Sequence, residues 1–96
     1  MMVVITYDVA TSKPGGIKRL RHVSKKCLDH GQRVQNSVFE CVLNSTELAV
    51  LKIELKKIID EKEDSLRIYV LGNHYKNKIE HFGVKTSIDV EGTLIF

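Results

Sequence analysis

The sequence lacks the features that mark membrane, secreted or disulfide-linked proteins. No run approaches the roughly 18 apolar residues of a membrane-spanning helix, and the first residues lack the basic region and cleavage site of a signal peptide. Cys27 and Cys41 are far apart, and neither belongs to a CxxC pair. We therefore expect a cytoplasmic protein without a membrane partner, in which both thiols are buried and reduced.

Motifs for several common kinds of chemistry are also missing. The histidines show neither HxxxH nor HExxH spacing, so we assign them no metal. The glycines at 15–16 do not follow the GxxxxGKS or GxxxxGKT spacing of a phosphate-binding loop. Three Phe, three Tyr and no Trp are too few for an aromatic surface that stacks RNA bases. These absences favour duplex binding through the backbone over the reading of splayed bases.

Length and composition indicate one globular domain. The 96 residues are too few to divide into two units. Apolar residues make up 43% and charged residues 28%, which is ordinary for a soluble protein. Because so short a chain buries a modest fraction of its surface, pairing with a second copy would help it.

Positive charge is concentrated in the first half of the chain. Residues 1–43 carry seven Lys or Arg against three acids, whereas residues 44–96 carry eight against nine. Between residues 13 and 33 there are seven basic residues and one acid. This asymmetry suits a polyanionic partner. A helix face kept basic for solubility is the alternative, and charge alone does not decide between the two.

Hydrophobic periodicity predicts the order β-α-β-β-α-β. The expected elements are a strand at 3–9, a helix from 17 that ends at Gly31 as its C′ residue, a strand, turn and strand at 32–43, a helix with an apolar stripe at 48–59, and a strand at 66–71. Asn44 and Glu47 have capping-box spacing. This order predicts an α+β, ferredoxin-like sandwich, a single domain over 1–96 with an extra C-terminal strand at 93–96.

The first helix is expected to be amphipathic. Apolar or small residues at 17, 20, 23, 24, 27 and 28 fall on one arc, and Lys18, Arg21 and Lys25 line another. A side chain at 11 or 12 is expected to cap the helix, with Pro14 in its first turn. One side would pack on the sheet and the charged side would stay free.

Asp8 stands at the end of an otherwise apolar strand. Residues 3–7 suit a strand that is buried on both faces. Burying a lone carboxylate is costly unless it finds a cation, hydrogen-bond donors or water. Asp8 is therefore either a metal ligand or an Asx cap of the following loop, and the residues alone leave both readings open.

The sheet face away from the helices is expected to be the contact of a homodimer. It would expose the patch Val4, Thr6, Tyr69 and Leu71, which favours face-to-face pairing. Alternate residues of a strand share a side, so Asp8 lies on the side of Val4 and Thr6. Asp8 would then sit at the margin of the contact, near its counterpart in the second copy.

Taken together, these stretches resemble the Cas2 family of CRISPR-associated proteins. The resemblance rests on TYDV at 6–9, GQRVQNSVFEC at 31–41 and RIYVLG at 67–72. The stretch IEHFG at 79–83 and the tail at 87–96 resemble the type I-C branch. Each motif is weak by itself, but their order and spacing are specific and run from end to end.

The resemblance implies a ferredoxin-like homodimer that binds one divalent ion through Asp8 of each protomer. Mg²⁺ is the expected ion and Mn²⁺ is possible. Members are described as metal-dependent endonucleases that act on single-stranded RNA or, in the type I-C branch, on double-stranded DNA. The family also bridges two dimers of the CRISPR integrase during spacer acquisition. The resemblance thus makes Asp8 both the metal ligand and the catalytic residue.

The resemblance also implies which cations touch nucleic acid. Arg33 matches a family position before the second hairpin strand, and Arg19 and Arg21 are approximate matches on the first helix, because the loop before them carries an extra Pro-Gly-Gly. Lys18 and Lys25 complete the basic set, since Lys and Arg contacts to phosphates give sequence-independent binding.

Two hypotheses of different classes follow. Mg²⁺ takes one or two carboxylates plus waters, so two copies of Asp8 suffice for a metal-dependent endonuclease, although most phosphodiesterases clamp two ions with several carboxylates. The alternative is a non-catalytic dimeric DNA-binding adaptor that bridges integrase dimers. A ferredoxin-like regulator of small molecules ranks last, because the chain carries no pocket signature.

Overall fold

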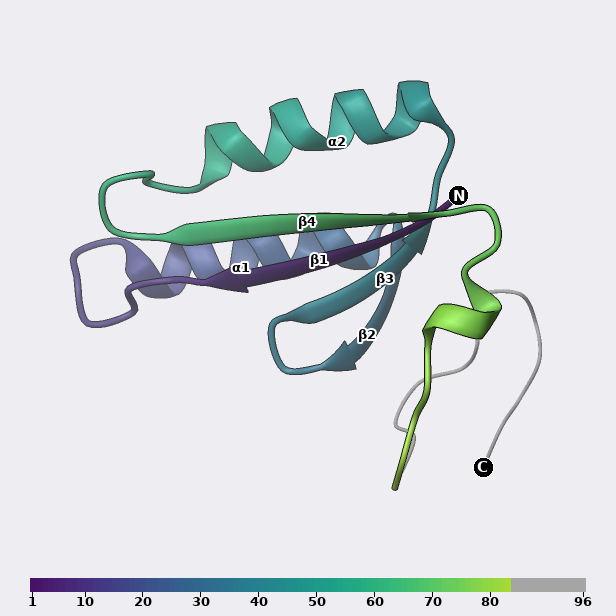
Figure 1. The fold of residues 1–96 in the computed structure, drawn as a ribbon. Coiled ribbons are helices and arrows are strands. Elements are labelled where there is room, and N and C mark those ends of the chain that lie inside the picture. The colour runs from purple at the N-terminus through teal and green to yellow at the C-terminus, as the bar shows by residue number, and fades with distance from the viewer. Residues whose placement is uncertain (84–96) are drawn as a thin grey trace.

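The fold is a four-stranded antiparallel sheet with two helices, as the computed structural model of residues 1–83 shows (Figure 1). The elements in chain order are β1 (Met2–Asp8), α1 (Gly16–Leu28), β2 (Gly31–Gln35), β3 (Val38–Val42), α2 (Ser45–Ile58), β4 (Ser65–Gly72) and the short 3₁₀ helix η1 (Lys76–Lys78). The predicted strand at 93–96 lies outside the described residues. No helix within 1–83 is long and apolar enough to span a membrane.

The strand order β2-β3-β1-β4 confirms the predicted ferredoxin-like α+β fold. Strand β1 lies at the centre, with Ile5 opposite Phe39 of β3 and opposite Ile68 of β4. Both helices supply buried residues to one core against the sheet, and α1 lies behind the sheet in Figure 1. Consequently one face of the sheet carries no helix.

The core lies between the helices and the inward face of the sheet. Its fully buried side chains are Val3 and Ile5 from β1, Val23 and Cys27 from α1, Phe39 and Cys41 from β3, and Leu51 and Leu55 from α2. The predicted burial of both cysteines is therefore confirmed, and both are free thiols. The predicted apolar stripe of α2 is confirmed at Leu48, Leu51 and Leu55.

The predicted start of α2 and the predicted hairpin are confirmed. The Asn44 side chain accepts a hydrogen bond from the Glu47 amide at 2.8 Å, and the Glu47 side chain accepts one from the Asn44 amide at 3.0 Å. Strands β2 and β3 pair across the turn at 36–37, where Ser37 has a φ of 64°.

Helix α1 begins close to the predicted position, but the predicted cap at 11 or 12 is wrong, and Pro14 precedes the helix instead of lying in its first turn. Its N-cap is Gly15, with a φ of 77° and no capping side chain. The following residue passes so close to the Ala10 carbonyl oxygen that a Cβ on Gly16 would lie 2.1 Å from it. The helix therefore begins after Pro14, where the glycine pair permits this close approach.

The predicted role of Gly31 is also wrong. Helix α1 ends at Leu28 with Asp29 as a right-handed C-cap, and Gly31 is the first residue of β2. A Cβ at Gly31 would lie 2.3 Å from the Glu40 carbonyl oxygen. Close strand packing, and not a left-handed turn, therefore explains this glycine.

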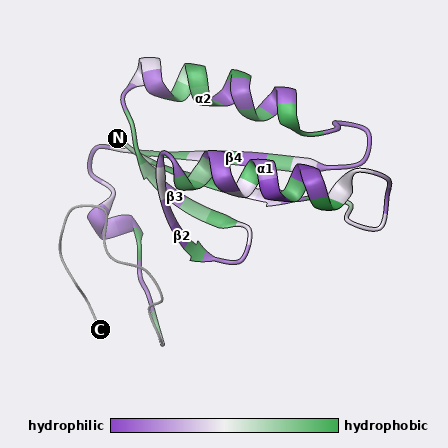
Figure 2. Ribbon diagram, turned by 180° about the vertical axis from the view of Figure 1, so that it is seen from behind, coloured by the Kyte–Doolittle hydropathy of each residue, from purple (hydrophilic) through white to green (hydrophobic). Residues whose placement is uncertain are grey.

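Strand β1 is buried on one face only in this chain, which corrects the expectation of two buried faces. Val3, Ile5 and Tyr7 are buried, whereas Val4 and Thr6 are half-exposed on the face without helices. On α1, Ile17 and Leu28 belong to the predicted apolar arc but are exposed. Figure 2 shows hydrophilic and hydrophobic residues alternating along α1.

Candidate nucleic-acid and metal site

Asp8 is the last residue of the central strand, and its side chain is exposed. It pairs with Ser65 of β4 and lies on the helix-free face, because Val4 and Thr6 occupy the same side of β1. Within residues 1–83 the Asp8 side chain makes no hydrogen bond or ion pair, so it does not cap the following loop. Its oxygens are available to a ligand.

The backbone on both sides of Asp8 is held firmly. Tyr7 and Val9 are buried in the core. The Tyr7 amide donates to the Ser37 carbonyl oxygen at 3.1 Å, and the Tyr7 hydroxyl lies 2.8 Å from the Ser24 hydroxyl. Burial raises the pKa of Tyr7, and the contact with Ser24 partly opposes that rise. An exposed carboxylate on a fixed backbone is therefore the local geometry of Asp8.

The predicted basic residues of α1 fall into two groups. Lys18, Arg21 and Lys25 are exposed and take part in no ion pair with other described residues. Lys26, which the prediction did not include, pairs with Glu54 of α2 across a distance of 2.7 Å. The outer face of α1 thus keeps three unpaired cations for a polyanion.

Arg19 belongs to the second group, because it is paired inside the chain. Its Nε donates to Oδ2 of Asp64 at 2.8 Å, its Nη2 donates to Oδ1 at 3.2 Å, and its Nη1 donates to the Pro14 carbonyl oxygen at 3.0 Å. The Arg19 side chain is 17% exposed and that of Asp64 is 0% exposed. The predicted nucleic-acid contact of Arg19 stays a prediction, and it would compete with this pairing.

Arg33 lies on the opposite face of the sheet from Asp8. It pairs with Phe39, and its guanidinium carbon lies 5.4 Å from the centre of that ring. Because Phe39 faces the core and cross-strand partners share a face, Arg33 is at the helix side of the edge strand β2. Its side chain remains exposed at that edge.

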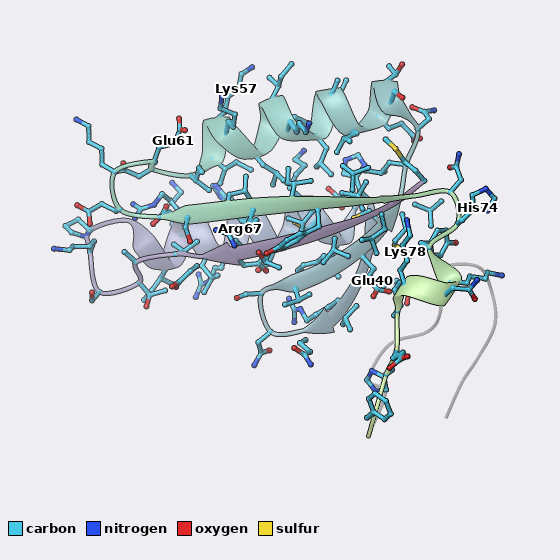
Figure 3. All side chains as sticks on the ribbon, viewed as in Figure 1. Glu40, Lys57, Glu61, Arg67, His74 and Lys78 are labelled. Atoms are coloured by element: carbon cyan, nitrogen blue, oxygen red, sulfur yellow. The ribbon has the colours of Figure 1, made fainter. Side chains whose placement is uncertain are left out.

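The chain therefore does not bring Asp8 and the predicted cations together on one surface. Arg67 does share the face of Asp8, because it lies opposite Thr6 on β4, and its exposed side chain is labelled at that strand in Figure 3. It donates a hydrogen bond to the Tyr69 hydroxyl at 3.2 Å. The alternation along 66–71 indicates that Arg67 and Tyr69 share one face of the strand. It does not indicate which residues of β1 lie opposite Arg67.

The thiols offer no nucleophile to this site. Burial raises the pKa of Cys27 to about 12 and that of Cys41 to about 11. A thiol that stays protonated in an apolar core is inert. Phosphodiester chemistry at Asp8 would therefore depend on carboxylate oxygens and not on sulfur.

The donor chemistry of the Asp8 carboxylate fits a hard divalent cation. Oxygen ligands suit Mg²⁺ and Mn²⁺. Across residues 1–83 there is no group of three or more His, Cys, Asp or Glu side chains that could hold an ion within one chain. A second copy that adds its own Asp8 would supply the two carboxylates that Mg²⁺ often takes.

Comparison with known proteins gives a consistent result. The family model described as CRISPR associated protein Cas2 matches residues 1–79. The chain is 65% identical over 96 residues to the CRISPR-associated endonuclease Cas2 of Halalkalibacterium halodurans, and the match covers 100% of both proteins. It is 50% identical over 95 residues to the CRISPR-associated endoribonuclease Cas2 of Nitratidesulfovibrio vulgaris, covering 99% of this chain and 93% of that protein.

A solved structure shows the same fold. The crystal structure of Streptococcus pyogenes Cas2 matches with a TM-score of 0.76 and 55% identity, covering 86% of this chain and 100% of that one. The family model, the full-length relatives and the shared fold agree, and they confirm the resemblance. The chain belongs to the CRISPR-associated Cas2 family.

Proposed function

We propose that the protein is a divalent-metal-dependent endonuclease of the CRISPR adaptation machinery, acting on double-stranded DNA or single-stranded RNA. The observation that carries the proposal is Asp8, an exposed carboxylate on a fixed backbone at the end of the central strand. Relatives at 65% and 50% identity are named endonuclease and endoribonuclease, which supports the reaction class.

The proposed active form is a homodimer that pairs through the helix-free face. This face carries Tyr69, which is 46% exposed, next to the half-exposed Val4 and Thr6. In a two-fold contact each copy presents the same patch to the other. Since Asp8 lies on this face at the end of β1, the two carboxylates would converge near the axis.

In this dimer, each Asp8 would hold one side of a shared Mg²⁺ or Mn²⁺ ion. When bound, such an ion supplies charge stabilisation and water activation for phosphodiester hydrolysis. The chain's own part is to hold Asp8 so that the carboxylates of the two copies point toward the same ion. Lys18, Arg21, Lys25 and Arg33 do not share the surface of Asp8, so they would hold parts of the phosphate backbone away from the ion. Arg19 would contribute less because Asp64 already occupies its guanidinium.

The experiment is a cleavage assay of the full chain and its Asp8→Asn variant. End-labelled duplex DNA and single-stranded RNA are incubated with Mg²⁺, with Mn²⁺ and with chelator. Asp29→Asn is the matched control, because Asp29 is an exposed carboxylate at the far end of α1. We expect cleavage that needs the metal, survives Asp29→Asn and is lost in Asp8→Asn. Cleavage that persists in Asp8→Asn would overturn the proposal.

A second candidate is a non-catalytic dimeric adaptor that binds DNA and bridges integrase dimers. The exposed cations of α1 favour it as much as they favour the nuclease, because phosphate binding needs no catalytic residue. If wild type binds duplex tightly but cleaves nothing with either metal, the adaptor is the better description. The integrase itself, the cytoplasmic location and the type I-C branch stay predictions.

A further inference from the structure

Asp64 is a buried carboxylate that connects three segments of the chain. Its Oδ1 accepts from the Ala10 amide at 3.0 Å and from Arg19 Nη2 at 3.2 Å. Its Oδ2 accepts from Arg19 Nε at 2.8 Å and from the Asp60 amide at 2.9 Å. The loop after β1, helix α1 and the turn between α2 and β4 therefore meet at one side chain that is 0% exposed.

This connection lies directly beside Asp8. The Ala10 amide, which Asp64 holds, is two residues along the backbone from Asp8. On the neighbouring strand, Ser65 is opposite Asp8, and Asp64 immediately precedes it. Asp64 therefore fixes both the chain that leaves Asp8 and the start of the strand that pairs with it.

Arg19 extends the same support to the rest of the loop. One edge of its guanidinium forms the two-point contact with Asp64, and its remaining nitrogen donates to the Pro14 carbonyl oxygen. Gly16 closes the loop on itself, since its amide donates to the Lys13 carbonyl oxygen at 3.0 Å. The loop at 9–16 is thus held at Ala10 and at Pro14 by one ion pair.

We propose that Asp64, acting with Arg19, is a positioning residue that orients Asp8 for metal binding. The proposal rests on the proposed function, because it takes Asp8 as the metal ligand. Asp64 itself touches neither metal nor substrate, and it acts through the backbone of residues 9 and 10. Groups that orient a metal ligand without touching the ion commonly set metal affinity.

The test measures Mn²⁺ affinity directly by calorimetry, at a temperature well below the unfolding midpoint of every variant. We expect Asp64→Asn to weaken Mn²⁺ binding by about 10-fold or more. Cleavage should show the same shift in the metal concentration for half-maximal rate, whereas the rate at saturating metal should stay near that of wild type. If Asp64 serves stability alone, its substitution would lower the unfolding midpoint but would change neither the Mn²⁺ affinity nor the metal concentration for half-maximal cleavage.

Glu54→Gln is the matched control, because it removes a different ion pair, between Glu54 and Lys26, at the opposite end of α1 from the loop at 9–16. It should leave Mn²⁺ affinity unchanged. Arg19→Lys keeps the charge but loses the two-point contact, so it should retain more Mn²⁺ affinity than Arg19→Gln. If Asp64→Asn does not fold, the Mn²⁺ affinities of these two Arg19 variants test the proposal in its place.

Asp8→Asn separates the two proposals. If it leaves Mn²⁺ binding unchanged, the proposed metal site itself is wrong. If it abolishes Mn²⁺ binding while folded Asp64→Asn binds Mn²⁺ as wild type does, the metal site stands and the positioning role of Asp64 is overturned. Equal Mn²⁺ affinity in Arg19→Lys and Arg19→Gln would likewise count against the role of the ion pair.

Discussion

Asp8 is the last residue of β1 and Asp64 immediately precedes the neighbouring strand β4, so both lie at the same end of the sheet, but the fold uses them in opposite ways. Asp8 is exposed on the helix-free face, and its side chain makes no hydrogen bond or ion pair within residues 1–83. Asp64 is buried on the helix side, where it accepts four hydrogen bonds. The two residues are of the same type, so the face of the sheet decides their role. On the helix-free face a carboxylate is available to bind a ligand, and on the helix side it stabilises the fold.

The largest difference is expected in stability. Asp64→Ala leaves two backbone amides and the Arg19 guanidinium without their partner, so we expect a loss on the order of 3 kcal/mol in the free energy of unfolding. Asp8→Ala should change it by less than about 0.5 kcal/mol, as exposed substitutions usually do. Urea denaturation of both variants measures this. Equal losses of unfolding free energy in the two variants would show that Asp8 and Asp64 do not differ in their contribution to stability.

The next difference concerns the cations of α1. Replacing Lys18, Arg21 and Lys25 by Gln should weaken duplex binding and reduce the slope of log K against log salt by about 2.7, if each contacts one phosphate. The matched control replaces Lys52, Lys56 and Lys57 on α2, which removes the same charge from exposed positions on the other helix.

Single substitutions on α1 test whether only the unpaired arginine contacts phosphate. Arg21→Gln should reduce the salt slope without loss of stability, because Arg21 is exposed and takes part in no described ion pair. Arg19→Gln should destabilise the fold and change the slope less, because Asp64 holds its guanidinium. Equal slope changes in filter-binding titrations would show that Arg19 also reaches phosphate.

A smaller difference is expected in the dependence of stability on pH. The Arg19 guanidinium, together with the Asp60 and Ala10 amides, holds the pKa of Asp64 down to about 2 from an ordinary 3.8. A lowered pKa in the folded state means that this stabilisation is present above about pH 4 and is lost as pH falls toward 2. Asp64→Asn should therefore flatten the stability curve between these values, measured by urea denaturation at each pH.

The smallest effect is expected at the ion pair between Lys26 and Glu54. Lys26 lowers the pKa of Glu54, but both side chains are about one-third exposed, at 30% and 34%. Exposed pairs contribute little because water and salt screen them. Glu54→Gln should change thermal stability far less than Asp64→Asn, and a comparable loss would show that burial does not explain the contrast.

Much of the fold was readable from local patterns. The capping box at Asn44 and Glu47, the apolar stripe of α2 and the alternation in β4 each depend on near neighbours in sequence, and all are present. Errors occurred in β1, for which two buried faces were expected, and at the glycines. Gly16 and Gly31 are required by the approach of another segment of backbone, and no local pattern reports that approach.

The candidate site was readable only in part. Asp8 could be identified because a carboxylate at the end of an apolar strand is unusual in itself. Asp64 could not, because it is one of several acids in the charged turn before β4. Arg19 likewise looks no different in sequence from Arg21, although one is paired and the other exposed.

The sequence by itself determined the order of elements, the exposed end of β1 and the concentration of cations on α1, since each follows from the period of a helix or strand. Only the tertiary structure decided which charges stay available. Arg19 and Asp64 are 45 residues apart, and the sheet order β2-β3-β1-β4 brings their segments together. Burial then makes their pairing obligatory, because an isolated charge in the core is too costly to leave unpaired.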